Sequence, residues 1–207
     1  MFRLPATALL FIACSTLPLP AATIDFDDID ASAGDVILGS YRGYSFTNFS
    51  AYTTVPGFPG FNNGIASGPN AAYSSDSGSI SSATAFDFTA AAFGSGYYDG
   101  LQLTIQGLRG GTVYDTRTIT VSTTGAKGYS FNFTGIDELL FTTSTTASTT
   151  DPYYCGAVGC SYFTIDNAVL TPDMKPPSNQ APEPSTLTMF ALGLAALLPL
   201  KFCRFGR

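Results

Sequence analysis

Residues 101–121 read LQLTIQGLRGGTVYDTRTITV, and this stretch decides the class of the fold. Apolar and polar residues alternate on both sides of the Gly110-Gly111 pair, which is the period of a strand with one buried face. Two alternating runs joined by a two-glycine turn predict a β-hairpin with strands over 101–108 and 113–121. The first of these strands is expected to bury its odd-numbered residues.

Short strands of the same kind continue in both directions from this hairpin. Helix-forming residues are sparse, and no segment of residues 23–172 has the period of a helix. Further strands are expected over residues 23–30, 43–49, 83–88, 129–133, 139–142 and 161–170. About eight or nine strands separated by turn residues predict an all-β fold, a β-sandwich. Residues 52–70 form a long irregular segment, a place where β scaffolds often carry function.

The part of the chain between its two apolar ends is strongly acidic. Residues 23–172 hold thirteen Asp and Glu residues against four cations, Arg42, Arg109, Arg117 and Lys127, which gives a net charge near −9. Such a surface repels phosphate groups, which argues against a nucleic-acid partner.

The composition also limits catalysis. The chain has no His, and this removes Ser–His and Cys–His nucleophiles and every histidine metal site. Paired carboxylates of the kind used in glycoside hydrolysis remain open. However, residues 23–172 hold a single Glu, Glu138, and their Asp residues fall mostly in expected turns. We therefore expect that the protein is not an enzyme and requires no cofactor.

The N-terminal segment and the cysteines indicate an exported protein. Residues 1–22 begin with the cation Arg3, continue through an apolar run and end in small residues, which is the pattern of a cleavable signal peptide. A permanent anchor and lipid attachment at Cys14 are the alternatives. In an oxidising compartment, Cys155 and Cys160 are expected to form a disulfide that closes a short loop. A metal site is the alternative for this pair, although a second pair of ligands is missing.

The last 26 residues, 182–207, have three ordered parts. Pro182, Glu183 and Pro184 begin an extended segment, because each proline fixes its own φ and biases its predecessor away from helix. An apolar run follows, with a predicted transmembrane segment over 186–202. A basic end then closes the chain, and this order leaves the C-terminus in the cytoplasm.

This tail resembles the PEP-CTERM sorting signal of Gram-negative bacteria, except that Pro199 interrupts the apolar run. The resemblance implies that an exosortase-type enzyme processes the chain near Pro182-Glu183-Pro184. It also implies a membrane-anchored precursor that is then delivered to the cell envelope, the outer surface or the medium. An ordinary membrane anchor with a coincidental Pro-Glu-Pro is the alternative.

Short motifs in the domain resemble the sandwich domains that often accompany PEP-CTERM tails. These motifs are residues 131–139 and 163–170, which are similar to the last strands of such domains. The resemblance implies a jelly-roll-like β-sandwich over residues 23–172. A Pro-rich linker at 173–181 would join it to the tail.

Jelly-roll modules that bind carbohydrate commonly carry a structural Ca²⁺ between their first and last strands, so the resemblance also implies a candidate metal site. Asp25, Asp27, Asp166 and Asn167 would supply the oxygen ligands that Ca²⁺ prefers. The alternative is that these residues are solvated acids at strand ends.

Aromatic and polar residues of the long irregular segment and of residues 97–99 are expected to meet at one loop end of the sandwich, as a candidate carbohydrate site. They are Tyr52, Phe58, Phe61, Asn62, Asn63, Tyr97, Tyr98 and Asp99. Aromatic faces stack on sugar rings, and Asp or Asn side chains bind sugar hydroxyls. The alternative is that the Tyr and Phe residues belong to the core.

These patterns together predict an exported, non-catalytic protein of the cell surface or the extracellular matrix. A module that binds exopolysaccharide is the alternative function.

Overall fold

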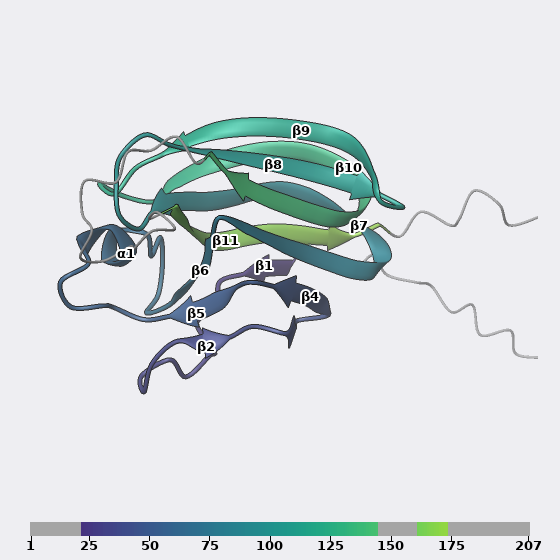
Figure 1. The fold of residues 1–207 in the computed structure, drawn as a ribbon. Coiled ribbons are helices and arrows are strands. Elements are labelled where there is room, and N and C mark those ends of the chain that lie inside the picture. The colour runs from purple at the N-terminus through teal and green to yellow at the C-terminus, as the bar shows by residue number, and fades with distance from the viewer. Residues whose placement is uncertain (1–21, 145–160, 174–207) are drawn as a thin grey trace, which may run out of the picture. The chain divides into compact units, whose positions relative to one another are not determined.

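The computed structural model describes residues 22–144 and 161–173. Eleven strands and one short helix make up this part of the chain (Figure 1). In order they are β1 (Ala22–Ile24), β2 (Val36–Ile37), β3 (Ser40–Tyr41), β4 (Tyr44–Thr47), β5 (Ser50–Tyr52), α1 (Pro59–Asn63), β6 (Ala71–Ser75), β7 (Ser77–Ser95), β8 (Leu101–Arg109), β9 (Thr112–Val121), β10 (Lys127–Thr143) and β11 (Tyr162–Pro172). The predicted all-β class is confirmed.

All strands belong to one antiparallel sheet in the order β2-β5-β6-β11-β7-β10-β8-β9. Two short branches complete the sheet, because β1 pairs with β11 and the β3–β4 hairpin pairs with β7. Figure 1 shows the sheet folded over on itself, so that β8 and β9 lie over β1, β4 and β5. The apolar faces of the two layers enclose the core between them.

Buried phenylalanines join the two layers. The Phe141 ring of β10 stacks on the Phe163 ring of β11 with centroids 5.7 Å apart, and Phe49 meets both rings edge-on. All three side chains are fully buried. Since burying one large apolar side chain contributes about 1.5–3 kcal/mol, such contacts between layers are a main source of stability.

The hairpin predicted over 101–121 is confirmed. β8 and β9 pair from Leu101 opposite Val121 to Arg109 opposite Thr112, and the alternate residues of β8 are buried. Gly110 and Gly111 both have positive φ, +56° and +75°. Glycine adopts this conformation without the steric penalty of a side chain, so the two-glycine turn closes the hairpin.

One predicted turn is wrong. The sequence indicated separate strands over 129–133 and 139–142, but β10 runs unbroken through this region. The pairing of β10 with β7 shifts register repeatedly between Ser130 and Glu138, and Gly135 has a φ of +61°. The turn-forming residues therefore produce bulges, which bend a strand without ending it.

The first strand is shorter than its alternation predicted. Phe26 has a φ of +61° and turns the chain, so β1 ends at Ile24, although both residues are fully buried as expected. β1 pairs with β11, with Ala22 opposite Leu170. The expected proximity of the first and last strands is thus confirmed.

Several predictions concern residues outside the described ranges. These are the signal peptide, which is described only from residue 22, the Cys155–Cys160 disulfide and the transmembrane segment at 186–202. Within the described ranges, no helix is long and apolar enough to cross a bilayer, since α1 has only five residues.

Candidate functional site

The connection between β5 and β6 folds into a small second core at one end of the sandwich. It contains α1, whose first residue is Pro59, a position where the missing N–H of proline is tolerated. The buried hydroxyl of Tyr52 donates to the carbonyl oxygen of Phe61 at 2.7 Å. Asn62 fixes the approach to the helix, because its Oδ1 accepts from the N–H of Val55 at 2.6 Å and its Nδ2 donates to the carbonyl of Val55 at 3.1 Å.

Two further contacts hold α1 against the sheet. The Nδ2 of Asn63 donates to the carbonyl of Thr123 at 2.9 Å, and the carbonyl of Asn63 accepts from the N–H of Ala126 at 2.7 Å. Gly60 approaches the end of β7 so closely that a Cβ there would lie 2.2 Å from the carbonyl oxygen of Gly96. The amides of both α1 asparagines are therefore used to hold this connection in place.

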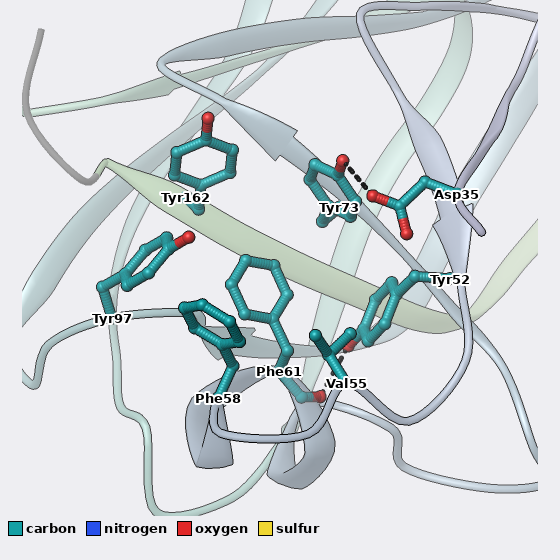
Figure 2. A pocket seen from close by; sticks show the side chains of 8 residues that line it. All are labelled: Asp35, Tyr52, Val55, Phe58, Phe61, Tyr73, Tyr97 and Tyr162. Carbon is teal, nitrogen blue, oxygen red and sulfur yellow. Dashed lines mark hydrogen bonds between the residues drawn. The ribbon is translucent and has the colours of Figure 1, made fainter. Parts of the chain in front are cut away.

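Aromatic side chains enclose a hollow beside α1 (Figure 2). Its lining consists of Asp35, Tyr52, Val55, Phe58, Phe61, Tyr73, Tyr97 and Tyr162. The Phe61 ring meets the Tyr73 and Tyr97 rings edge-on, with centroids 5.4 and 5.3 Å away. The cavity has a volume of about 170 Å³, below the roughly 300–1,000 Å³ of sites for drug-sized ligands. It therefore has room for one ring-sized group.

Polar groups lie among the aromatic rings. The Tyr73 hydroxyl donates to Oδ2 of Asp35 at 2.7 Å, and burial together with this bond raises the pKa of Tyr73 to about 12. Burial, followed by the proximity of Tyr162 and Asp35, raises the pKa of Tyr97. Within the described part of the chain, the hydroxyls of Tyr97 and Tyr162 make no hydrogen bond. The hollow thus offers neutral phenol donors and one carboxylate acceptor to a ligand.

The structure brings together four of the eight residues singled out for carbohydrate: Tyr52, Phe58, Phe61 and Tyr97 line the hollow. The side chains of Asn62 and Asn63 hold α1 in place instead. Tyr98 does not line it, because it packs against the main core instead. Asp99 does not line it either. Its Oδ1 accepts from the Ser122 hydroxyl at 2.7 Å, which is the first of the bonds that lower the pKa of Asp99.

Four lining residues were missed in the sequence: Asp35, Val55, Tyr73 and Tyr162. Tyr73 and Tyr162 lie in β6 and β11, directly opposite Ser50 and Ser75 in the sheet, and Asp35 precedes β2. Tyrosines within alternating strands carry no local signal that separates a pocket wall from an ordinary core position. The pairing of β6 with both β5 and β11 is what places these tyrosines together.

Asp166, one of the four candidate Ca²⁺ ligands, is fully buried and already satisfied. Its Oδ2 accepts from the N–H groups of Ala66 and Ser67 at 2.8 and 2.9 Å, and its Oδ1 accepts from the N–H of Asn167 at 2.7 Å. The Asn167 side chain in turn accepts from the Ser67 hydroxyl at 3.0 Å. Burial raises the pKa of Asp166 to about 6, against the opposing effect of these bonds.

The other two candidate Ca²⁺ ligands also have partners. Asp25 lies 3.5 Å from the Arg42 guanidinium in an exposed ion pair, and Oδ1 of Asp27 accepts from the N–H of Asn70 at 3.2 Å. Among the described residues, no group of three acidic, His or Cys side chains is arranged to hold a metal ion. The Ca²⁺ site therefore stays a prediction.

Comparison with protein-family models identifies one segment of the chain. Residues 180–204 match the PEP-CTERM protein-sorting motif, which confirms the sorting tail predicted at the C-terminus. The motif supports export, membrane anchoring and later processing of the chain. No curated protein matches the sequence.

Three solved structures illustrate what the fold is similar to. The Stig cyclase FisC from Fischerella sp. TAU has a TM-score of 0.43 and 14% identity, over 73% of this chain and 98% of its own. TmCBM61, in complex with β-1,4-galactotriose, has a TM-score of 0.37 and 14% identity, over 65% and 92%. CBM51 from Clostridium perfringens GH95, in complex with methyl-galactose, has a TM-score of 0.32 and 9% identity, over 78% and 95%.

Proposed function

We propose that the protein is a non-catalytic component of the cell surface or the extracellular matrix of a Gram-negative bacterium. An exosortase-type enzyme processes it near Pro182-Glu183-Pro184, after the transmembrane segment at 186–202 has anchored the precursor. The observation that carries this proposal is the PEP-CTERM match over residues 180–204. The acidic composition of residues 23–172 supports it, because a net charge far from zero keeps an exposed domain soluble.

Intact mass spectrometry of protein from cells and from the medium tests this proposal. A species that begins near Thr23 and ends near Pro182, alone or with an added moiety, is expected. Glu183→Ala should instead leave residues 201–207 on a membrane-bound species, whereas Asp173→Asn removes an acid outside the motif and should be processed normally. Wild-type protein that keeps its basic end in the membrane fraction would refute the proposed processing.

A second function, carbohydrate binding, is favoured by the aromatic hollow. Sugar rings present apolar C–H faces that pack on aromatic side chains, and hydroxyls that need hydrogen-bond partners. Phe58, Tyr97 and Tyr162 are half-buried, so part of each ring is accessible. The hydroxyls of Tyr97 and Tyr162, which make no hydrogen bond to the described residues, can pair with sugar hydroxyls. A volume of about 170 Å³ suits a single pyranose ring.

The charge of the hollow favours a neutral sugar. Asp35 is the charged residue among the described residues of the lining, and none of these is a cation. A carboxylate within an acidic domain repels uronates and other anionic sugars. Since the pKa of Tyr73 is about 12, its hydroxyl stays protonated at neutral pH and continues to hold Asp35 by its hydrogen bond. The other oxygen of Asp35 remains available to a sugar hydroxyl.

Retention on a gel that carries the producer's own exopolysaccharide tests this second function. Tyr162→Ala is expected to weaken binding by about 0.5–1.5 kcal/mol, or roughly 2- to 12-fold, the range for one aromatic contact. Tyr114→Ala is the matched control, because Tyr114 lies on β9 and is 61% exposed, away from the lining. Equal retention of the two folded variants would contradict binding in the hollow.

A further inference from the structure

A second hollow adjoins the first and shares two of its rings. Phe58 and Tyr97 line both hollows, and their rings meet edge-on with centroids 5.8 Å apart. The other walls of the second hollow are Gly57, Pro59, Gly60, Gly96 and Thr123, and its volume is about 200 Å³. The two hollows are therefore similar in size and lie on a shared aromatic pair.

Glycines keep side chains out of the second hollow. A Cβ at Gly60 would lie 2.2 Å from the carbonyl oxygen of Gly96, and a Cβ at Gly96 would lie 2.6 Å from the Phe61 ring. Gly57 has a φ of +84°, a conformation that other residues rarely adopt. Glycine at such positions permits the backbone to approach a ligand closely. The wall is thus peptide backbone and cannot be filled without strain.

Thr123 lines this hollow, and its hydroxyl is held in a fixed orientation. Its Oγ1 donates to Oδ1 of Asp99 at 2.8 Å, and its N–H donates to the same oxygen at 2.7 Å. Because its proton is committed to Asp99, the hydroxyl oxygen of Thr123 presents its free lone pair as an acceptor. The hydrogen bonds from Ser122 and Thr123 lower the pKa of Asp99, which keeps it ionised at neutral pH. Asp99 is therefore a positioning residue that acts through Thr123.

We propose that the second hollow is a second sugar subsite, so that the site binds a neutral disaccharide unit with one ring in each hollow. The linkage between the rings would cross the Phe58–Tyr97 pair, which both hollows share. This inference rests on the carbohydrate-binding function proposed above and specifies its ligand. Cavities of about 170 and 200 Å³ each accommodate one pyranose ring, so a third sugar finds no further enclosed space in them.

Calorimetric titration of the full chain in mild detergent tests the second subsite. The probes are the methyl glycoside, disaccharide and trisaccharide of β-1,4-linked glucose and of β-1,4-linked galactose. In the series that binds, the disaccharide is expected to bind about tenfold or more tightly than the methyl glycoside, which corresponds to about 1.4 kcal/mol. The trisaccharide should add little to this affinity.

Thr123→Leu enlarges a side chain that lines only the second hollow. It should reduce disaccharide affinity to that of the methyl glycoside and leave the methyl glycoside unaffected. Thr124→Leu, a change at the exposed neighbour, should keep the preference for the disaccharide. If Thr123→Leu fails to fold, Thr123→Val removes the hydroxyl at constant size and should weaken only the disaccharide.

Two failures are distinguishable. Equal affinities for methyl glycoside and disaccharide would overturn the second subsite while leaving carbohydrate binding in the first hollow intact. Absence of heat with all probes, confirmed by no retention on the exopolysaccharide gel, would overturn the carbohydrate function and the inference together.

Discussion

The buried carboxylate of Asp166 predicts an inverted pH dependence of stability. Burial raises its pKa in the folded protein to about 6 from the ordinary value of 3.8. Between these values the folded state binds more protons than the unfolded state, so this group makes the protein less stable as the pH rises. Asp166→Asn removes the titrating carboxyl group and should therefore abolish this fall in stability with rising pH.

The magnitude follows from the two pKa values. Between pH 4 and pH 7, a shift from 3.8 to about 6 changes the free energy of unfolding by roughly 2 kcal/mol. The amide of Asn cannot accept all the N–H groups that Asp166 now pairs, so the variant also loses a hydrogen bond, which costs about 1–3 kcal/mol at every pH. The expected signature is thus a stability advantage of wild type over the variant that is about 2 kcal/mol larger at pH 4 than at pH 7.

Urea unfolding followed by tyrosine fluorescence measures this difference, since the chain has eleven Tyr and no Trp. Asp99→Asn is the matched control, because the pKa of Asp99 is lowered by its hydrogen bonds. Removing the Asp99 carboxylate should change the pH dependence of stability in the opposite direction, with the largest loss of unfolding free energy near neutral pH. A wild-type advantage over Asp166→Asn that is equal at pH 4 and pH 7 would refute the reasoning.

Three further predictions concern packing, the sheet edge and metal. Gly60→Ala places a Cβ 2.2 Å from a carbonyl oxygen and should lower the free energy of unfolding by about 1–3 kcal/mol, whereas Gly125→Ala, where nothing lies within 4 Å, should leave it nearly unchanged in urea titrations. Arg117→Ala removes the guanidinium that donates to the carbonyl of Ser130, on a side of β10 that has no partner strand among the described residues. An uncovered strand edge promotes aggregation, so light scattering should rise faster for this variant than for the control Arg42→Ala. If the predicted Ca²⁺ site exists, the thermal unfolding midpoint should be higher in calcium than in chelator. Equal midpoints would refute the predicted site.

The hairpin around Gly110 and Gly111 could be predicted because both its signals are local. Alternation defines which side chains are buried, and the two glycines define the turn. At 135–138 the same kind of signal was misleading. Gly135 does adopt a positive φ, but pairing of β10 with β7 continues on both sides of it. Whether turn residues end a strand or bend it depends on neighbouring strands, which the local sequence does not contain.

The aromatic hollow could be predicted only in part. Tyr52, Phe58 and Phe61 lie in one irregular segment, so their meeting was expected from chain proximity. Tyr97 is distant in sequence, and it was expected only at the same end of the sandwich. The sequence also predicts Tyr98 at this site, but the chain bends at Gly96 and Tyr97, directly after β7. Tyr97 accordingly lines the hollow while Tyr98 packs on the main core. The remaining walls are set by long-range pairing of strands.

The position of β11 has a mechanical consequence. Tyr162, at its first residue, lines the hollow, and the chain leaves the sheet at Asp173, just beyond its other end, toward the sorting tail. If the tail is held and a polymer pulls on the hollow, the load runs along the strand over about 36 Å. β11 is flanked by β7 on one side and by β6 and β1 on the other, all antiparallel. Tension would therefore shear many hydrogen bonds at once instead of opening them one after another, the loading direction in which a sheet resists force best.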